Sequence, residues 1–295
     1  MTVDPKSLER LLARAESVLA RLESHLPPRN ADVDWKALAF RWKRRNGAGA
    51  LHAVKHPHVI RFDDLHDIDD QKARLDANTR HFVKGLPANN VLLTGARGTG
   101  KSSLVKAALQ KYAKHGLRLI EVDRVDLVDL PEIVDLIAQR PERFIVFSDD
   151  LSFEASDPGY KALKSVLDGG VAALTENVLI YATSNRRHLM PEHMAENLAA
   201  KHTGEGEIHP EETTEEKVSL SERFGLWLSF YPFDQDQYLR IAAHWSGELS
   251  GTSVDIANIR KDALLWALER GSRSGRIAWQ FARHWAAEHA ASRKP

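Results

Sequence analysis

The residues from 95 to 102 combine three glycines with a lysine and a serine at spacings that suit phosphate binding. They read Gly95-Ala96-Arg97-Gly98-Thr99-Gly100-Lys101-Ser102, which fits the pattern G-x-x-x-x-G-K-[S/T] at every required position. An apolar run at 90–94 precedes this segment and a helical pattern at 103–109 follows it. A strand that leads through a glycine turn into a helix directs backbone N–H groups and the positive helix end to one place. The segment therefore predicts a site for a nucleoside triphosphate.

The residue types within this loop predict different roles. Lys101 would reach the outer phosphates, and the hydroxyl of Ser102 would hold Mg²⁺. Glycine is required at 95, 98 and 100 because a Cβ atom there would block the approach of the backbone or exclude its dihedral angles. We expect the nucleotide to contact the whole loop, which comprises Gly95, Ala96, Arg97, Gly98, Thr99, Gly100, Lys101, Ser102 and Ser103.

Two aspartates end the apolar run 143–148, about fifty residues after the loop. Asp149 would hold Mg²⁺ directly or through water, and Asp150 would orient and deprotonate an attacking water molecule. The alternative is that both carboxylates cap the next helix. Because a phosphate loop precedes them, we favour the metal and water roles.

Short β-rich runs alternate with helical runs between residues 90 and 232. The strand candidates are 90–94, 117–123, 143–148, 177–184 and 226–231, and helix candidates follow Ser102, Pro131 and Pro158. This alternation predicts an α/β fold, a parallel five-stranded sheet with helices on both faces. The polar segment 201–217 is expected to be an exposed loop between the fourth and fifth strands.

The sequence on both sides of this region has a helical period. Leucines recurring after Asp4-Pro5, as far as Pro27-Pro28, predict one helix, which packs either on its own domain or on a partner helix. After Pro232 three apolar stripes predict a small all-α lid of three helices. We therefore expect an N-terminal helical region at 1–60, a nucleotide-binding core at 61–232 and a lid domain at 233–295.

The segment 35–61 mixes aromatic residues with cations, among them Phe40, Trp42, Arg41, Lys43, Arg44, Lys55 and Arg61. Two interpretations are open. Such a mixture can contact nucleic acid through phosphate charge and base stacking. It can also be a set of half-buried aromatic rings with a solvated basic flank.

The composition favours a cytoplasmic protein that has no membrane segment. The 295 residues carry a formal net charge of +0, which gives no global attraction to nucleic acid or anionic lipid. No apolar run approaches the roughly 20 residues of a membrane helix, and Glu9, Arg10 and Arg14 argue against a secretory signal. The absence of cysteine excludes disulfides and thiolate metal sites.

Over about residues 60 to 285 the chain resembles the AAA+ ATPases. The segment 180–185 is similar to the sensor-1 strand, whose polar end residue, here Asn185, helps to position water near the γ-phosphate. The segment 221–224 resembles the motif that carries the arginine finger, which would be Arg223. The resemblance extends to the sensor-2 motif at 275–278, with Arg276 reaching the γ-phosphate, and to adenine-covering stretches at 62–65 and 67–68.

A closer resemblance, from Pro87 through the sensor strand, is to a bacterial family described as domain of unknown function 815. It implies ATP binding with Mg²⁺, hydrolysis, and an oligomer in which Arg223 acts on the neighbouring subunit. It also implies conformational change acting on a protein or nucleic-acid client. Because Asp150 stands where AAA+ enzymes usually carry Glu, hydrolysis is expected to be slow. The alternative is that Glu154 contributes a further carboxylate to the hydrolysis.

Two other functions are open. One is a nucleotide-gated loader or adaptor for DNA or a helicase-like protein, with little turnover, which Asp150 and the segment 35–61 favour. The other is a small-molecule kinase built on the same loop. Asn185 and a separate helical lid with Arg276 argue against the kinase.

Overall fold

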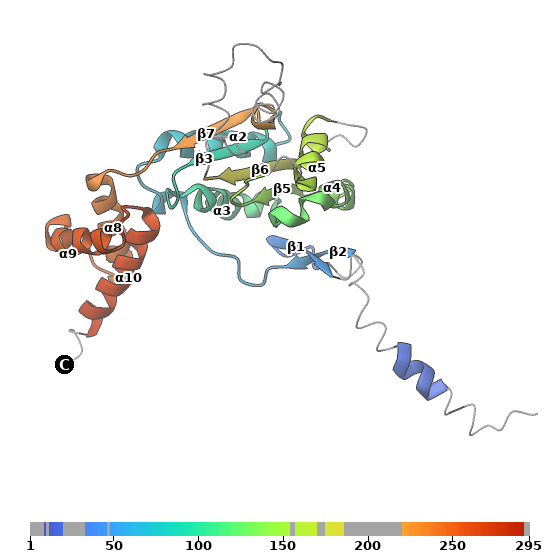
Figure 1. Cartoon of the computed structure of the whole chain (residues 1–295), viewed down its shortest axis with the longest axis horizontal. Helices are drawn as coiled ribbons and strands as arrows, with labels where there is room; N and C mark the ends of the chain where they lie inside the picture. Colours follow the sequence, from blue (N-terminus) through green and yellow to red (C-terminus); the bar gives the residue numbers. More distant parts are fainter. Residues whose placement is uncertain are drawn as a thin grey trace, which may run out of the picture.

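A seven-stranded sheet forms the centre of the structure (Figure 1). This computed structural model describes residues 9, 12–19, 33–45, 48–153, 157–169, 175–185 and 220–291. The strand order is β2-β1-β4-β5-β6-β3-β7, and every neighbouring pair is parallel except β1 and β2. The strands are β1 (Ala39–Arg45), β2 (Ala48–Ala53), β3 (Val91–Gly95), β4 (Leu117–Glu121), β5 (Arg143–Ser148), β6 (Val178–Ser184) and β7 (Leu226–Phe230).

The sheet has seven strands rather than the five that the sequence predicted. The five expected strands are present as β3 to β7, but β1 and β2 add an antiparallel hairpin at the edge of β4. The expectation that residues 1–60 are helical was therefore wrong for the hairpin. Phe40 and Trp42 are buried while Arg41 and Lys43 are exposed, which is the two-residue period of a half-buried strand.

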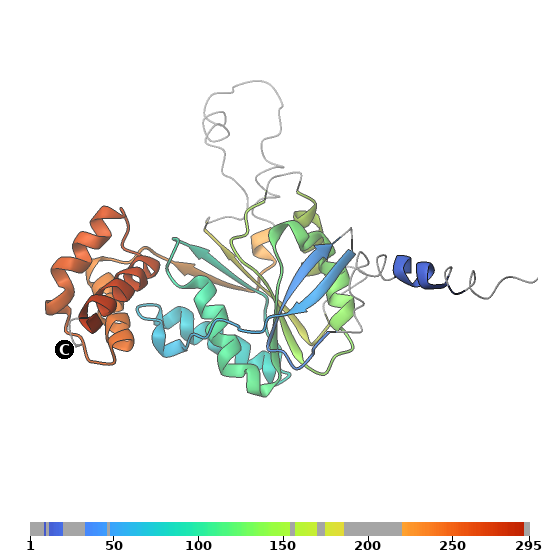
Figure 2. The same cartoon turned by 90° about the horizontal axis from the view of Figure 1, so that it is seen from below.

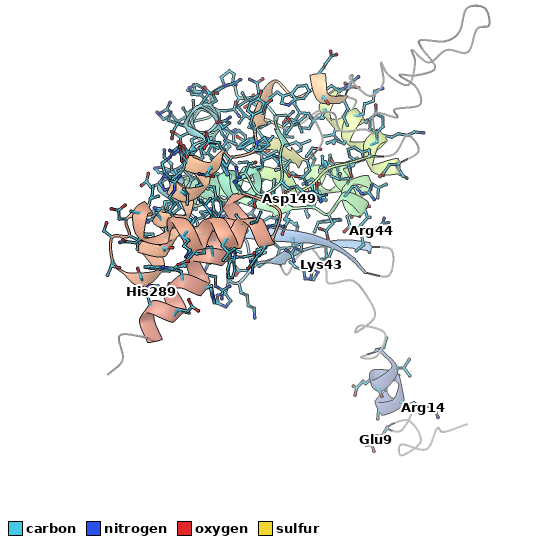
Figure 3. The ribbon with its side chains drawn as sticks, turned by 60° about the vertical axis from the view of Figure 1, so that its left-hand side comes forward. Glu9, Arg14, Lys43, Arg44, Asp149 and His289 are labelled. Atoms are coloured by element: carbon cyan, nitrogen blue, oxygen red, sulfur yellow. The ribbon has the colours of Figure 1, made fainter. Side chains whose placement is uncertain are left out.

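Acidic residues pair with two of the cations of the hairpin, Arg41 and Arg44. Arg41 forms an ion pair of 2.6 Å with Glu121, and Arg44 lies 3.3 Å from Asp129. Asp129 also accepts a hydrogen bond of 2.9 Å from the indole Nε1 of Trp42. Lys43 and Arg44 project from the hairpin in Figure 3. These contacts favour the interpretation of the segment as buried aromatic rings with a basic flank.

Helices cover both faces of the sheet (Figure 2). One apolar cluster joins the sheet to α2 (Asp69–Val83) and α3 (Lys101–Tyr112), and the other joins it to α4 (Leu130–Ile137) and α5 (Pro158–Leu167). Along β5 the alternation is explicit, because Phe144 and Val146 lie in one cluster while Ile145 and Phe147 lie in the other. Short 3₁₀ helices are η2 (Phe62–Asp64), η3 (Ala113–His115) and η4 (Arg124–Asp129).

Three further helices lie beyond one end of the sheet, as the sequence predicted (Figures 1 and 2). They are α8 (Gln235–Ser250), α9 (Ile256–Glu269) and α10 (Gly275–Ala291), and they share an apolar cluster of their own. Phe233 and Trp245 pack against both this cluster and the cluster that joins the sheet to α2 and α3. These two rings therefore attach the helical lid to the core.

Three expectations fall partly or wholly outside the described residues. Of the N-terminal leucine stripe, residues 12–19 are helical and exposed, which gives no support to packing on the core. The expected loop at 201–217 lies outside the described residues, as does Glu154. None of the helices in the described part of the chain has the length and apolar character that a bilayer crossing requires.

Candidate nucleotide-binding site

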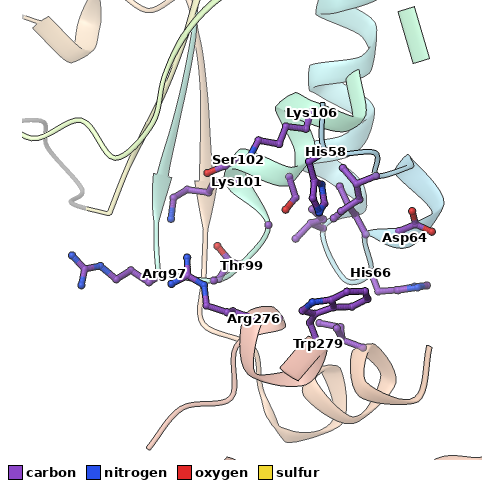
Figure 4. Close-up of a pocket in the computed structure, with 18 of the residues that line it drawn as sticks. His58, Asp64, His66, Arg97, Thr99, Lys101, Ser102, Lys106, Arg276 and Trp279 are labelled. Atoms are coloured by element: carbon purple, nitrogen blue, oxygen red, sulfur yellow. The ribbon is translucent and has the colours of Figure 1, made fainter. Parts of the chain in front are cut away.

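A cavity of about 990 Å³ lies where β3, β5 and β6 end, between the core and the helices α8 and α10 (Figure 4). The carboxyl ends of neighbouring parallel strands are the usual place for ligands in such sheets. Most of the residues expected to form the site line this cavity: Arg97, Gly98, Thr99, Gly100, Lys101, Ser102, Ser103, Asp149, Asp150, Asn185 and Arg276. The expected site residues that line the cavity are up to 179 residues apart in the sequence, from Arg97 to Arg276.

The loop between β3 and α3 has the backbone that its glycines permit. Gly95, Gly98 and Gly100 have φ angles of 122°, 71° and 96°, in the region that L-residues rarely adopt. At Gly95 a Cβ atom would lie 1.9 Å from the backbone oxygen of Phe230, so no side chain fits there. The expected need for glycine at these positions is confirmed.

Lys101 opens α3, and its ammonium group points back into the loop. Its Nζ donates to the carbonyl oxygens of Gly95 and Ala96, at 2.8 and 2.7 Å, and to Oδ1 of Asn185 at 3.0 Å. Burial lowers the pKa of Lys101 to about 8, and Asp149 and Asp150 only partly oppose this shift. An anion bound beside the ammonium group would stabilise its charged form.

The first aspartate after β5 lies against the serine of the loop. Oδ1 of Asp149 accepts a hydrogen bond of 2.6 Å from the hydroxyl of Ser102 and another from Thr183. Hydroxyl and carboxylate oxygens are suitable ligands for Mg²⁺, so this pair fits the ion. In the described part of the chain, no three His, Cys, Asp or Glu side chains form a metal-binding group.

The second aspartate is linked to the lysine through an amide. Nδ2 of Asn185 donates to Oδ1 of Asp150, while Oδ1 of the same Asn185 accepts from Lys101. Asp150 has a φ angle of 55°, one of two positive values among the described non-glycine residues. One chain of hydrogen bonds therefore joins the phosphate loop, Asn185 and the second aspartate.

Arg276 is placed in the cavity by the start of α10. The backbone N–H of Gly275 donates to the carbonyl oxygen of Gly98 at 2.8 Å, which holds the helix start against the phosphate loop. Ser274 caps the helix by accepting a 3.3 Å hydrogen bond from the N–H of Ile277. Figure 4 shows Arg276 and Thr99 facing the same part of the cavity.

The other half of the cavity is mainly apolar and was found only in part from the sequence. Leu65 and Ile68, from the stretch expected to cover the base, do line it, together with Ile60, Ile241, Trp245 and Trp279. The rings of Trp245 and Trp279 meet edge to face at 4.7 Å. Trp245 lies on the apolar stripe of α8, so its helical period indicated core packing rather than a cavity wall.

Three of the expected site residues do not line the cavity: Gly95 and Ala96, at the start of the loop, and Arg223. The Nε of Arg223 donates to Oδ1 of Asp168, which lies at the end of α5. The cavity also contains polar residues that the sequence did not single out, namely His58, His66, Lys106, Thr183 and Glu248. Thr183 could have been noticed as the first of three polar residues, Thr183 to Asn185, that follow an apolar run.

The sheet order, the phosphate loop and the helical lid together define an AAA+ P-loop fold. Within that class, the chain belongs to the family described as Protein of unknown function (DUF815), which matches residues 35–289. None of the curated proteins compared with the chain matches it.

Solved structures with a similar fold share little sequence with the chain. A point mutant of Thermotoga maritima RuvB is 16% identical, with a TM-score of 0.51, over 76% of this chain and 64% of RuvB. C. elegans PCH-2 is 14% identical, with a TM-score of 0.46, over 78% of this chain and 72% of PCH-2. Aeropyrum pernix ORC1 in complex with DNA is also 14% identical, with a TM-score of 0.47, over 81% of this chain and 63% of ORC1. The chain thus spans less than two thirds of RuvB, and the likeness supports the fold alone.

Proposed function

We propose that this protein binds ATP with Mg²⁺ in the cavity and hydrolyses it slowly. The observation that carries the proposal is the hydrogen-bonded set of Lys101, Asn185 and Asp150 beside the pair of Ser102 and Asp149. A loop lysine, a loop serine or threonine and a strand-end aspartate have the corresponding roles in other P-loop enzymes.

The proposed reaction assigns a task to each group. Lys101 donates to the outer phosphates, and the loop amides hold the remaining phosphate oxygens. Bound through Ser102 and Asp149, Mg²⁺ would neutralise charge that develops on the phosphates. Asp150 orients a water molecule and accepts its proton as the water oxygen bonds to the γ-phosphorus. The bond from that phosphorus to the bridging oxygen breaks, which releases ADP and phosphate.

We assign the adenine and ribose to the apolar half of the cavity. Leu65, Ile68, Trp245 and Trp279 line this half, and a nucleobase prefers such a surface for stacking and burial. Arg276 lies between the two halves and would contact the γ-phosphate. Closure of the lid on bound nucleotide would then couple the nucleotide state to the shape of the protein.

We further propose that the active site is completed by a neighbouring subunit. Arg223 lies with Asp168 outside the cavity that contains Lys101. If it supplies the arginine finger, the contact between subunits is heterologous, as in a ring or a helical assembly. The action would be on a protein or nucleic-acid client in the cytoplasm. We divide the chain at about residue 232, between a core that includes the β1–β2 hairpin and the helical lid.

A second candidate is a nucleotide-gated loader or adaptor for DNA or a helicase-like protein, with little turnover. One observation favours it: the carboxylate of Asp150 is held by Asn185. A carboxylate engaged in this way is less available to a water molecule. Salt-titrated DNA binding tests the nucleic-acid client, because phosphate contacts make affinity fall steeply as salt rises.

Phosphate release tests the enzymatic proposal. Wild-type protein should release phosphate from ATP in a Mg²⁺-dependent reaction, and Asp150→Ala should abolish it. Asp135→Ala, which removes an exposed carboxylate of α4, is the matched control and should leave the rate unchanged. Equal rates for wild type and Asp150→Ala would remove Asp150 from the mechanism, and binding without release would favour the adaptor.

A further inference from the structure

One hydroxyl group, that of Thr183 near the end of β6, contacts both aspartates of the site. Its Oγ1 donates to Oδ1 of Asp149 and accepts a hydrogen bond of 2.9 Å from the backbone N–H of Asp150. The residue is 1% exposed and lines the cavity. A hydroxyl has a single proton to donate, so its donor capacity is used on the first aspartate.

The second contact fixes an unusual backbone. Asp150 lies in the left-handed region, at a φ angle of 55°, which L-residues other than Asn and Asp rarely occupy. The N–H of the next residue, Leu151, donates to the carbonyl oxygen of Thr183 at 2.7 Å, and the hydroxyl of Ser184 donates to the carbonyl oxygen of Leu151 at 2.7 Å. The end of β6 therefore holds the turn that carries both carboxylates.

The strand pairing alone does not hold this turn. The register of β5 and β6 ends at Ser148 opposite Ala182, one residue before Asp149. Beyond that point, the contacts just described replace the ladder. Among them, only the hydroxyl of Thr183 touches the side chain of one aspartate and the backbone of the other.

We propose that Thr183 is a positioning residue, an inference that rests on the proposed function. It holds the carboxylate of Asp149 in position to bind the metal ion and that of Asp150 in position to orient the attacking water. Groups that hold the ligands of a metal ion commonly change its affinity by about 10- to 100-fold when they are lost. A displaced general base has an effect of similar size on the rate. Binding of the phosphates depends on the loop amides and Lys101, which Thr183 does not contact.

Two substitutions separate the hydroxyl from the rest of the side chain in the full-length protein. Thr183→Val keeps the shape and removes the hydroxyl, whereas Thr183→Ser keeps the hydroxyl and removes the methyl group. For Thr183→Val we expect kcat to fall about 10- to 100-fold and the Mg²⁺ concentration for half-maximal rate to rise roughly tenfold. KM for ATP should stay within about twofold, and Thr183→Ser should restore most of the activity.

Three results would overturn the proposal. The first is that Thr183→Val has the kcat and the Mg²⁺ dependence of the wild type. The second is that Thr183→Ser is as impaired as Thr183→Val. The third is that neither Thr183→Val nor Thr183→Ala folds, as measured by circular dichroism. The last would assign the hydroxyl to folding. If wild-type protein releases no phosphate, the ATPase proposal fails separately. The Mg²⁺ dependence of nucleotide binding then decides: a higher requirement in Thr183→Val supports the positioning role, and an unchanged one overturns it.

Discussion

The backbone N–H of Gly275 donates a hydrogen bond of 2.8 Å to the carbonyl oxygen of Gly98, which joins the lid directly to the phosphate loop. A Cβ atom on Gly98 would lie 2.8 Å from Cβ of Ser274, the residue before this helix. Arg276 follows the contact by one residue and lines the same cavity. In the proposed function, a change in the loop on nucleotide binding would therefore reach the start of α10 without an intermediate side chain.

The first prediction concerns this contact. Gly98→Ala should weaken nucleotide binding, because the methyl group both displaces Ser274 and disfavours the φ angle of 71°. The left-handed conformation alone should cost about 1–2 kcal/mol of stability. Titration calorimetry and thermal unfolding measure the two effects.

Gly116→Ala is the matched control for this substitution. Gly116 has a φ angle of 89°, and its added Cβ atom would meet nothing within 4 Å. The control should lose a similar amount of stability while binding nucleotide like the wild type. Equal affinities for Gly98→Ala and wild type would show that the contact does not matter for binding.

The second prediction is that nucleotide affinity falls as the pH rises above about 8. Burial lowers the pKa of Lys101 to about 8, so the free protein loses this charge above that pH. The phosphates require the charged form and raise its pKa, so binding takes up a proton. The affinity should fall about tenfold between pH 7 and pH 9. Calorimetry in buffers of different ionisation enthalpy measures the proton uptake directly.

Lys101→Arg provides the control for this pH dependence. Because a guanidinium group stays charged over this range, any residual binding by the variant should be independent of pH. A wild-type affinity that is flat from pH 7 to pH 9, with no proton uptake, would contradict the assignment to Lys101.

The third prediction addresses the aspartate at position 150. Asp150→Glu restores the residue usual in AAA+ enzymes but should hydrolyse ATP no faster than the wild type. The reason is that the left-handed backbone of Asp150, at a φ angle of 55°, and its contact with Asn185 both suit the shorter aspartate side chain. Asp150→Asn should fold, bind ATP and fail to release phosphate. A faster Asp150→Glu enzyme would mean that chain length limits the rate.

The fourth prediction is that two inactive variants restore activity when mixed. Arg223→Ala should lower the rate by roughly 10³-fold if the residue supplies an arginine finger. Its mixture with Lys101→Ala should regain activity, because some sites would combine an intact phosphate loop with an intact Arg223. Arg41→Ala, which removes a surface ion pair with Glu121, should have no effect. An absence of recovery at every ratio would argue that Arg223 acts within its own subunit.

The sequence predicted those parts of the site that depend on local residue patterns. The loop from Gly95 to Ser102 and the pair of aspartates are each contiguous, and the strands before them are apolar runs within one or two residues of the observed bounds. The β1–β2 hairpin was not predicted, although Arg41 and Lys43 alternate with the buried rings of Phe40 and Trp42. The cations suggested a basic surface segment, and this interpretation did not use the two-residue period of a strand.

Other features depend on tertiary packing that no local pattern records. Trp245 and Trp279 come from different helices and become a cavity wall only when α8 and α10 pack together. The contact of Thr183 with both aspartates arises because β5 and β6 are neighbours in the sheet. The partner of Arg223, Asp168, lies 55 residues away.

Calorimetric titration of the full-length protein with ATP and Mg²⁺ tests the central claim most directly. The wild type should bind one nucleotide per chain, and Lys101→Ala should weaken binding by about 10- to 100-fold, since it removes a charge-assisted contact. Lys111→Ala, which removes a lysine paired with Asp76 outside the cavity, should bind like the wild type. No binding by the wild type, or equal affinities for wild type and Lys101→Ala, would contradict the account.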